Sequence, residues 1–121
     1  MSRDKKNLGD WGEEKAAKYL AAKKYHILGK KVRTTCGEID ILAQEKDTLV
    51  VVEVKTKTSV EQGAPEEMVD WKKQKKLVRL AQEVNQKFPQ YGIRIDVIAI
   101  EEKEIRHYIN AVLDDDTKYN S

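Results

Sequence analysis

Two strand-like runs separated by a short polar stretch constrain the fold of this chain more than any other feature. Glu38–Ala43 and Thr48–Lys55 are rich in β-branched and aliphatic side chains, and the residues between them, 44–47, are all polar. Such a spacing is typical of a β-hairpin. The sequence therefore predicts an antiparallel pair of strands over residues 38–55.

The predicted hairpin brings two acids together. A turn centred between Lys46 and Asp47 places Asp40 directly across from Glu53. At a separation of about 5 Å and an effective dielectric of about 20, two carboxylates repel by roughly 3 kcal/mol. Both acids interrupt otherwise apolar strands, so they need a compensating partner. Mg²⁺ or Mn²⁺ prefers carboxylate oxygens, and Asp40 and Glu53 are therefore candidate metal ligands.

Lys55 lies two residues after Glu53 and shares its face of the strand. An ammonium beside the acids can orient an attacking water or stabilise charge on phosphoryl oxygens, as phosphodiester hydrolysis requires. The alternative is that Asp40, Glu53 and Lys55 are solvated residues on a half-exposed hairpin, with Lys55 paired to Glu53.

The rest of the chain predicts an α/β fold. The expected elements are an amphipathic helix over Leu8–Lys24, a strand over Tyr25–Val32, a second helix from Pro65 to Phe88, a buried strand over Ile93–Ile100 and an edge strand over Glu104–Ile109. The second helix has an apolar stripe of Leu77, Leu80, Ala81, Val84 and Phe88. A strand–helix–strand crossover predicts that the strands ending at Lys55 and beginning at Ile93 run parallel in a mixed sheet.

Length and composition fit one compact domain over residues 1–121, with residues from about 113 as a frayed tail. Hydrophobic residues make up 40% and charged residues 36% of the chain, as in soluble globular proteins. No segment resembles a signal peptide or a membrane span, so we expect a cytoplasmic protein without a membrane partner. Cys36 is the only cysteine, which excludes an internal disulfide.

Two groups of basic residues are candidates for phosphate binding. Lys72, Lys75, Lys76 and Arg79 recur at helical spacing on one side of the second helix, and Lys30, Lys31 and Arg33 precede the hairpin. The net charge of +2 does not decide the matter, because binding needs local clusters. The alternative is that the stripe on the helix is only its solvated face.

Glu13 lies about 20° from Leu20 around the first helix, at the border of its apolar stripe. It either reaches the acid pair or is an ordinary acid that favours the N-terminal turn of a helix.

Five segments occur in an order that resembles one known family: GEEKAAKYL, GEIDILA, VVEVKTK, KKQKKL and RIDVIAI. The chain resembles the YraN-like bacterial proteins, predicted nucleases of the PD-(D/E)XK superfamily that are related in fold to archaeal Holliday-junction resolvases. The resemblance implies a restriction-endonuclease-like mixed sheet flanked by helices. It also implies a metal-dependent endonuclease that acts on DNA rather than RNA, including branched or structured DNA, and by analogy a homodimer.

The resemblance also assigns roles to residues. It implies that Asp40 and Glu53 bind Mg²⁺ or Mn²⁺ with help from the carbonyl of Val54, and that Lys55 assists the attacking water. Glu13 matches the acid of the family's first helix. Gln74 would flank the pocket, against the alternative of a polar residue on a helix surface. Many relatives carry Arg-Asn where this chain reads GKKVR over residues 29–33.

Two other functions remain open at this point. The chain could be a non-catalytic module that binds nucleic acid and retains the nuclease fold, or an assembly factor with a vestigial pocket. The second predicts affinity for neither metal nor nucleic acid.

Overall fold

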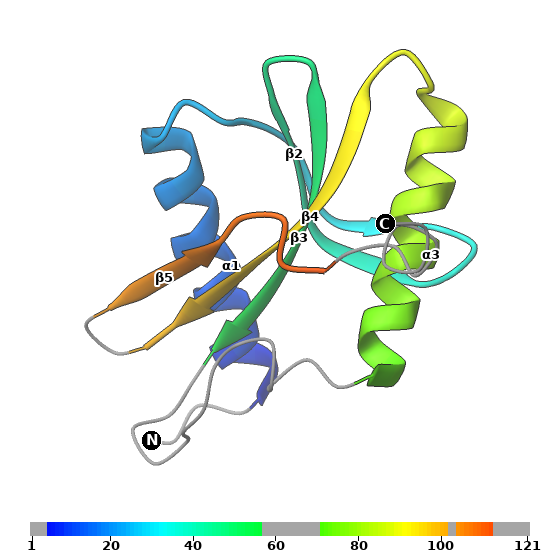
Figure 1. The fold of residues 1–121 in the computed structure, drawn as a ribbon. Helices are drawn as coiled ribbons and strands as arrows, with labels where there is room; N and C mark the ends of the chain where they lie inside the picture. Colours follow the sequence, from blue (N-terminus) through cyan, green and yellow to red (C-terminus); the bar gives the residue numbers. More distant parts are fainter. Residues whose placement is uncertain (1–4, 57–70, 102–103, 113–121) are drawn as a thin grey trace.

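The computed structural model describes residues 5–56, 71–101 and 104–112. In chain order the elements are α1 (Lys5–Ala22), β1 (His26–Arg33), β2 (Glu38–Glu45), β3 (Thr48–Thr56), α3 (Trp71–Lys87), β4 (Gly92–Ile100) and β5 (Ile105–Tyr108). The strands form one five-stranded sheet in the order β1-β2-β3-β4-β5 (Figure 1). The protein is therefore a mixed α/β structure.

The sheet combines antiparallel and parallel pairs. β1 with β2, β2 with β3, and β4 with β5 are antiparallel, whereas β3 and β4 run parallel. The parallel pair confirms the predicted crossover between the strand ending near Lys55 and the strand beginning near Ile93. β5 lies at an edge of the sheet, as expected.

The β2–β3 hairpin adopts the register that the sequence predicts. Ile41 pairs with Val52, and the ladder continues to Glu45 opposite Thr48. The turn therefore contains only Lys46 and Asp47, and Lys46 has a positive φ of 53°. The turn is narrower than the four polar residues of the sequence suggested, but its centre is unchanged.

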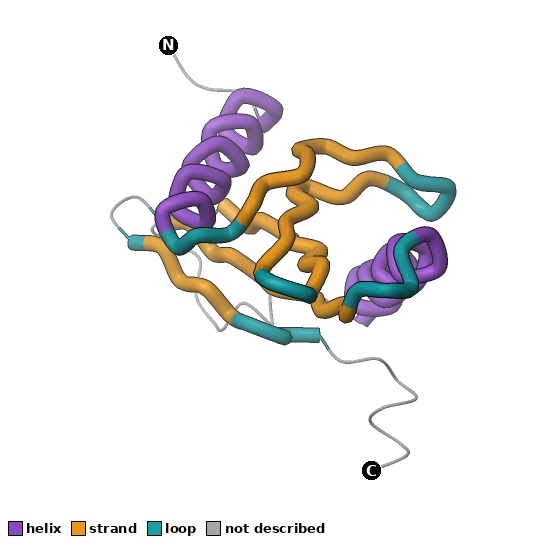
Figure 2. The backbone as a smooth tube through the Cα atoms, turned by 90° about the horizontal axis from the view of Figure 1, so that it is seen from above, coloured by secondary structure: helices purple, strands orange, loops and turns teal. Residues whose placement is uncertain are grey.

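The two helices cover opposite faces of the sheet (Figure 2). Under α1 lies a core of Ala16, Leu20, Tyr25, Ile41, Ala43, Val50, Val52, Ile98 and Ile100. Under α3 lies a core of Ile39, Leu49, Val51, Leu77, Leu80, Ala81, Val84, Ile95, Val97 and Val112. Alternate residues of β3 and β4 thus enter different cores, because successive side chains point to opposite faces.

Some sequence expectations need correction. Phe88 was expected to face the core, but α3 ends at Lys87 and Phe88 is 43% exposed. The helix start at Pro65 and the tail from residue 113 lie outside the described residues. Across the described ranges, no helix is both long and apolar enough to cross a bilayer.

A buried polar network occupies the α1 side of β4. Asp96 is fully buried, and its carboxylate accepts hydrogen bonds from Arg94 Nε at 3.0 Å, His107 Nε2 at 2.7 Å and the Asn110 amide at 2.9 Å. Arg94 also contacts the Tyr25 hydroxyl at 2.5 Å. Burial would raise the pKa of Asp96, but these hydrogen bonds outweigh it and lower the pKa. The network joins β4 to β5 and to the end of α1.

We expect Asp96→Asn to lower the free energy of unfolding by about 2–4 kcal/mol, because it leaves Arg94 without its buried anionic partner. Urea denaturation at pH 7 measures this change. Glu104→Gln is the matched control, because the Glu104–Arg106 pair is solvent-exposed and contributes little to stability. Equal losses in the two variants would contradict a structural role for the network.

Candidate functional site

The regular backbone pairing of β2 with β3 stops before Asp40, whose side chain then bonds to the β3 backbone. The described ladder ends with Ile41 opposite Val52, and two residues beyond Val52 the Val54 amide donates a 2.9 Å hydrogen bond to Asp40 Oδ2. Ile39 packs in the core under α3, whereas Ile41 packs in the core under α1. Residues two apart in a regular strand share a face, so β2 twists at Asp40. The Asp40 carboxylate is thereby fixed against β3.

Glu53 is the buried acid of this site. It follows Leu49 and Val51 on the face of β3 that α3 covers, and it is only 5% exposed. Burial, and next the charge and hydrogen bond of Asp40, raise the pKa of Glu53 from 4.5 to about 7, although Lys73 opposes the shift. The structure therefore brings the carboxyl groups of Asp40 and Glu53 into direct contact.

Lys73 joins the site, and the sequence analysis missed it. Its Nζ lies 3.2 Å from Glu53 Oε2, and it belongs to the first turn of α3. A signal was present in the sequence, because Lys73 precedes Leu77 by one helical turn and extends the apolar stripe rather than the basic one. The Lys73–Glu53 ion pair thus links α3 to β3 next to the core residue Leu77.

Glu13 reaches the same region from the other face of the sheet. Gly12 is buried against β3, where a Cβ would collide with the Thr56 hydroxyl, so the glycine lets α1 approach closely. Burial and the nearby Asp40 charge raise the pKa of Glu13, while Lys31, whose Nζ lies 3.4 Å from Glu13 Oε1, lowers it. Glu13 is thus close enough to Asp40 for the two charges to interact, and its role at the site stays a prediction.

Lys55 and Gln74 were also predicted to lie beside the acids. Lys55 is half-buried on β3, and by strand alternation it shares the face of Glu53. Gln74 is half-buried on α3, directly after Lys73. These positions fit a flanking role for each side chain.

The donors at this site fit a small divalent cation. Within the described ranges, no cluster of three or more His, Cys, Asp or Glu side chains is arranged to hold a metal ion. Asp40 and Glu53 are therefore a two-carboxylate pair rather than a complete cage. Mg²⁺ is commonly held by one or two carboxylates, with waters and substrate phosphates completing its shell. Burial is the main cause of the raised pKa of Glu53, and the neighbouring Asp40 charge adds to it while Lys73 opposes it.

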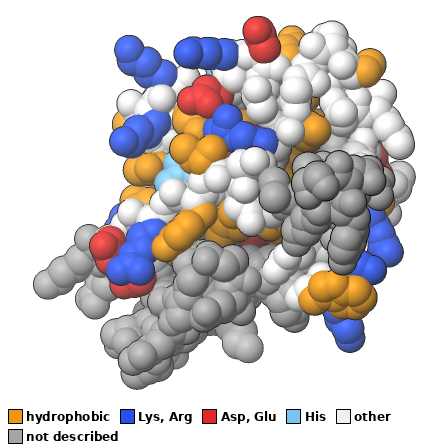
Figure 3. Space-filling model, in the orientation of Figure 1, with side chains coloured by type: hydrophobic (Ala, Val, Ile, Leu, Met, Phe, Trp, Pro, Cys, Tyr) orange, Lys and Arg blue, Asp and Glu red, His pale blue; other side chains and the backbone are white. Residues whose placement is uncertain are grey.

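The predicted basic residues differ in their contacts and in their exposure. Lys31 pairs with Asp10 at 2.6 Å as well as with Glu13, and Lys75 Nζ stacks over the Trp71 ring at 4.1 Å from its centre. Apart from the half-buried Lys75, all of the predicted basic residues are exposed: Lys30, Lys31, Arg33, Lys72, Lys76 and Arg79. Figure 3 shows Lys and Arg side chains at the lower right, near the start of α3, and others on the left of the molecule.

The loop between β1 and β2 is anchored on α3. Glu83 accepts hydrogen bonds from the amide and the hydroxyl of Thr35, the former at 3.1 Å. Gly37 has a φ of 142°, and a Cβ there would lie 2.6 Å from the Lys76 side chain. These contacts hold the loop that precedes Asp40 against α3 and keep Lys76 beside Gly37.

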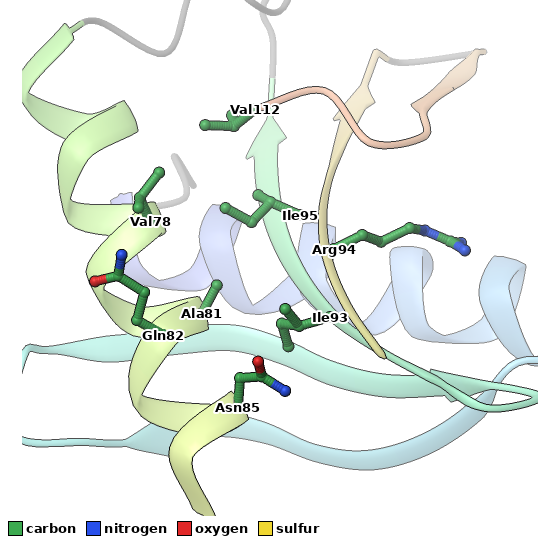
Figure 4. A pocket seen from close by; sticks show the side chains of 8 residues that line it. All are labelled: Val78, Ala81, Gln82, Asn85, Ile93, Arg94, Ile95 and Val112. Atoms are coloured by element: carbon green, nitrogen blue, oxygen red, sulfur yellow. The ribbon is translucent and has the colours of Figure 1, made fainter. Parts of the chain in front are cut away.

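Two cavities lie away from the acids. One of about 150 Å³ separates α3 from β4, and Ile93 and Ile95 point into it, whereas Arg94 extends to the opposite side of the sheet (Figure 4). The other, of about 390 Å³, is lined by Leu28, Leu42, Gln44, Leu49, Phe88, Gln90 and Tyr91. Neither of these two cavities is lined by Asp40, Glu53 or Lys55.

We expect Glu53→Gln to raise the free energy of unfolding at pH 8 by about 1–3 kcal/mol. A carboxyl whose pKa is higher in the folded protein stabilises it below pH 4.5, and this contribution is lost as the pH rises through about 7. The gain should therefore shrink at pH 5. Urea denaturation at both pH values measures it, with the exposed Glu14→Gln as a control that changes little. A variant less stable than the wild type at pH 8 would contradict the idea that ionised Glu53 destabilises the folded protein.

Comparisons with known proteins place the chain in a family. Residues 12–100 match the family described as "Uncharacterised protein family UPF0102". A UPF0102 protein of Caldanaerobacter subterraneus is 44% identical over 117 residues, which cover 89% of this chain and 96% of the relative. One of Thermodesulfovibrio yellowstonii is 45% identical over 105 residues, covering 86% and 94%, and one of Clostridioides difficile is 40% identical over 110 residues, covering 88% and 96%. This chain belongs to the UPF0102 family.

Proposed function

We propose that this protein is a metal-dependent endonuclease that hydrolyses phosphodiester bonds of DNA, including branched or structured DNA, on a PD-(D/E)XK nuclease-like fold. One observation carries the proposal: the half-buried Asp40 carboxylate meets the buried Glu53, and the Asp40 charge adds to the effect of burial in raising the pKa of Glu53. A buried acid whose charge is not fully compensated destabilises a fold. A position with a purely structural role would therefore be better filled by an apolar residue. Functional sites retain such groups.

Each side chain has a defined task in this proposal. Asp40 and Glu53 hold Mg²⁺ or Mn²⁺ together with the Val54 carbonyl, and the Val54 amide keeps Asp40 oriented. The bound ion supplies a Lewis acid that activates water and neutralises phosphoryl charge. Lys55 orients the attacking water from the same strand face.

Two further residues complete the proposed surroundings of the reaction. Glu13 adds negative charge beside Asp40 and draws Lys31 toward the site. Gln74 borders the reacting phosphate from α3.

The proposed DNA path runs over the basic side of α3. Lys72, Lys76 and Arg79 are exposed there, and the loop that precedes Asp40 is docked against the same helix. Lys30 and Arg33 on β1 extend the charge beyond that loop. Phosphate contacts of this kind position a duplex or a strand without reading its sequence. A homodimer that presents two such sites would suit a four-way junction, and a cytoplasmic location would suit DNA as the substrate.

We expect the purified protein with Mg²⁺ or Mn²⁺ to cleave at least one of three DNA substrates: linear duplex, single strand or four-way junction. Asp40→Asn and Glu53→Gln should each slow cleavage by about 100-fold or more, because each removes a charged ligand from the reacting centre. Gel assays with end-labelled DNA measure the rates. Glu14→Gln should cleave at the wild-type rate, since Glu14 is exposed on α1. Cleavage that survives both site substitutions, or no cleavage by the wild type, would refute the nuclease.

The second candidate is a non-catalytic module that binds nucleic acid. The exposed basic side of α3 favours it, since this surface is independent of the acids. Binding through Lys72, Lys76 and Arg79 should weaken steeply with salt, and replacing the three by Gln should lower the slope of log affinity against log salt by about 2–3. Fluorescence anisotropy measures the slope. An unchanged slope would exclude this surface as the binding site.

A further inference from the structure

Lys73 is placed differently from the other lysines at the start of α3. Its ammonium lies 3.2 Å from Glu53 Oε2, and its side chain is 36% exposed while that of Glu53 is 6% exposed. Lys75 lies over the Trp71 ring, and Lys76 lies beside Gly37. Among the ion pairs of the described residues, the one between Lys73 and Glu53 brings a cation to the acid pair from α3.

The ion pair places the Lys73 ammonium next to the carboxylate oxygens that would hold a divalent ion. A divalent ion on the oxygens of Asp40 and Glu53 would repel the Lys73 charge at this distance. A lysine ammonium sits on a flexible four-carbon stem, so it can move several ångströms while its backbone stays in place. Its partial exposure gives it a path outward. Outward from Glu53 is also the side from which a substrate phosphate must approach, because the sheet and core close the other side.

We propose that Lys73 binds the scissile phosphate: when a divalent ion occupies Asp40 and Glu53, its ammonium leaves Glu53 and donates to a non-bridging phosphate oxygen. This inference rests on the proposed nuclease function and adds a residue to it. The phosphodiester then lies between Lys55 on β3 and Lys73 on α3. In the absence of the ion, the same ammonium offsets part of the acid charge and helps to keep the site assembled.

The physical benefit is a contact that strengthens during the reaction. Negative charge spreads over the non-bridging oxygens as the phosphodiester reacts, and a cation already desolvated beside the site stabilises it more than a solvated one does. Lys72 cannot take this part from its exposed position, because it lies about 100° further back around the helix from Lys73. Lys73 is thus assigned a role in catalysis, whereas Lys72 is assigned one in binding DNA.

The test uses Lys73→Met and Lys73→Gln, with Lys18→Met as the matched control. Lys18 carries the same charge on the exposed side of α1, where it pairs with Glu14. Three quantities are measured at pH 8: the affinity for Mn²⁺ alone by calorimetry, the cleavage rate at saturating Mn²⁺, and the midpoint of thermal unfolding. Lys73→Gln keeps a hydrogen-bond donor beside Glu53, so it serves if the Met variant does not fold.

We expect both Lys73 variants to bind Mn²⁺ with unchanged or up to about fivefold higher affinity, because the competing ion pair is gone. Their cleavage rate should fall by about 100-fold, the usual loss when one stabilising donor is removed. Lys18→Met should match the wild type in both measurements.

Two results would overturn the inference. Cleavage by the folded variants at the wild-type rate would show that Lys73 only offsets charge. Loss of Mn²⁺ binding in the variants would show that Lys73 organises the acids rather than the phosphate. If the wild type itself neither binds Mn²⁺ nor cleaves DNA, the proposed function fails and this inference falls with it, a result distinguishable from the other two.

Discussion

The structure of the site depends on the contact between β2 and β3 at Asp40. The regular ladder ends at Ile41 and Val52, and beyond it the Asp40 carboxylate binds the Val54 amide. This bond holds β2 against β3 while β2 twists, so that Ile39 and Ile41 enter different cores. A main-chain donor is satisfied by a side chain, and an acid is fixed beside Glu53 as a result.

Two buried acids of this protein have opposite environments, and the contrast separates structure from function. Asp96 is surrounded by donors, and its pKa is lowered despite full burial. Glu53 faces another carboxylate, and its pKa is raised to about 7. An acid surrounded by donors stabilises the fold that contains it, whereas Glu53 beside a second carboxylate is the acid that the proposed function assigns to the metal ion. The two lie on opposite faces of the sheet, so the structural network does not compete with the site.

The candidate site combines charged residues of five elements: Asp40 on β2 and two ion pairs that join the other four. Lys31 from β1 pairs with Glu13 from α1, and Lys73 from α3 pairs with Glu53 from β3. Each lysine is more exposed than the acid it contacts. The cations therefore form the outer part of the arrangement and the carboxylates the inner part. In the proposed function, a metal ion or phosphate entering from solvent would meet these flexible ammonium groups before the carboxylates.

The sequence by itself determined the hairpin register over Ile41–Glu45 and Thr48–Val52 and the parallel direction of β3 and β4, because alternation and turn position are local properties. Tertiary structure decided which residues from distant segments come into contact. The end of α3 at Lys87 left Phe88 exposed, and the packing of α3 on β3 brought Lys73 to Glu53. It likewise joined Arg94, Asp96 and His107 in one network. A helix pattern shows which face is apolar, but the residue that each polar side chain meets depends on how distant elements pack together.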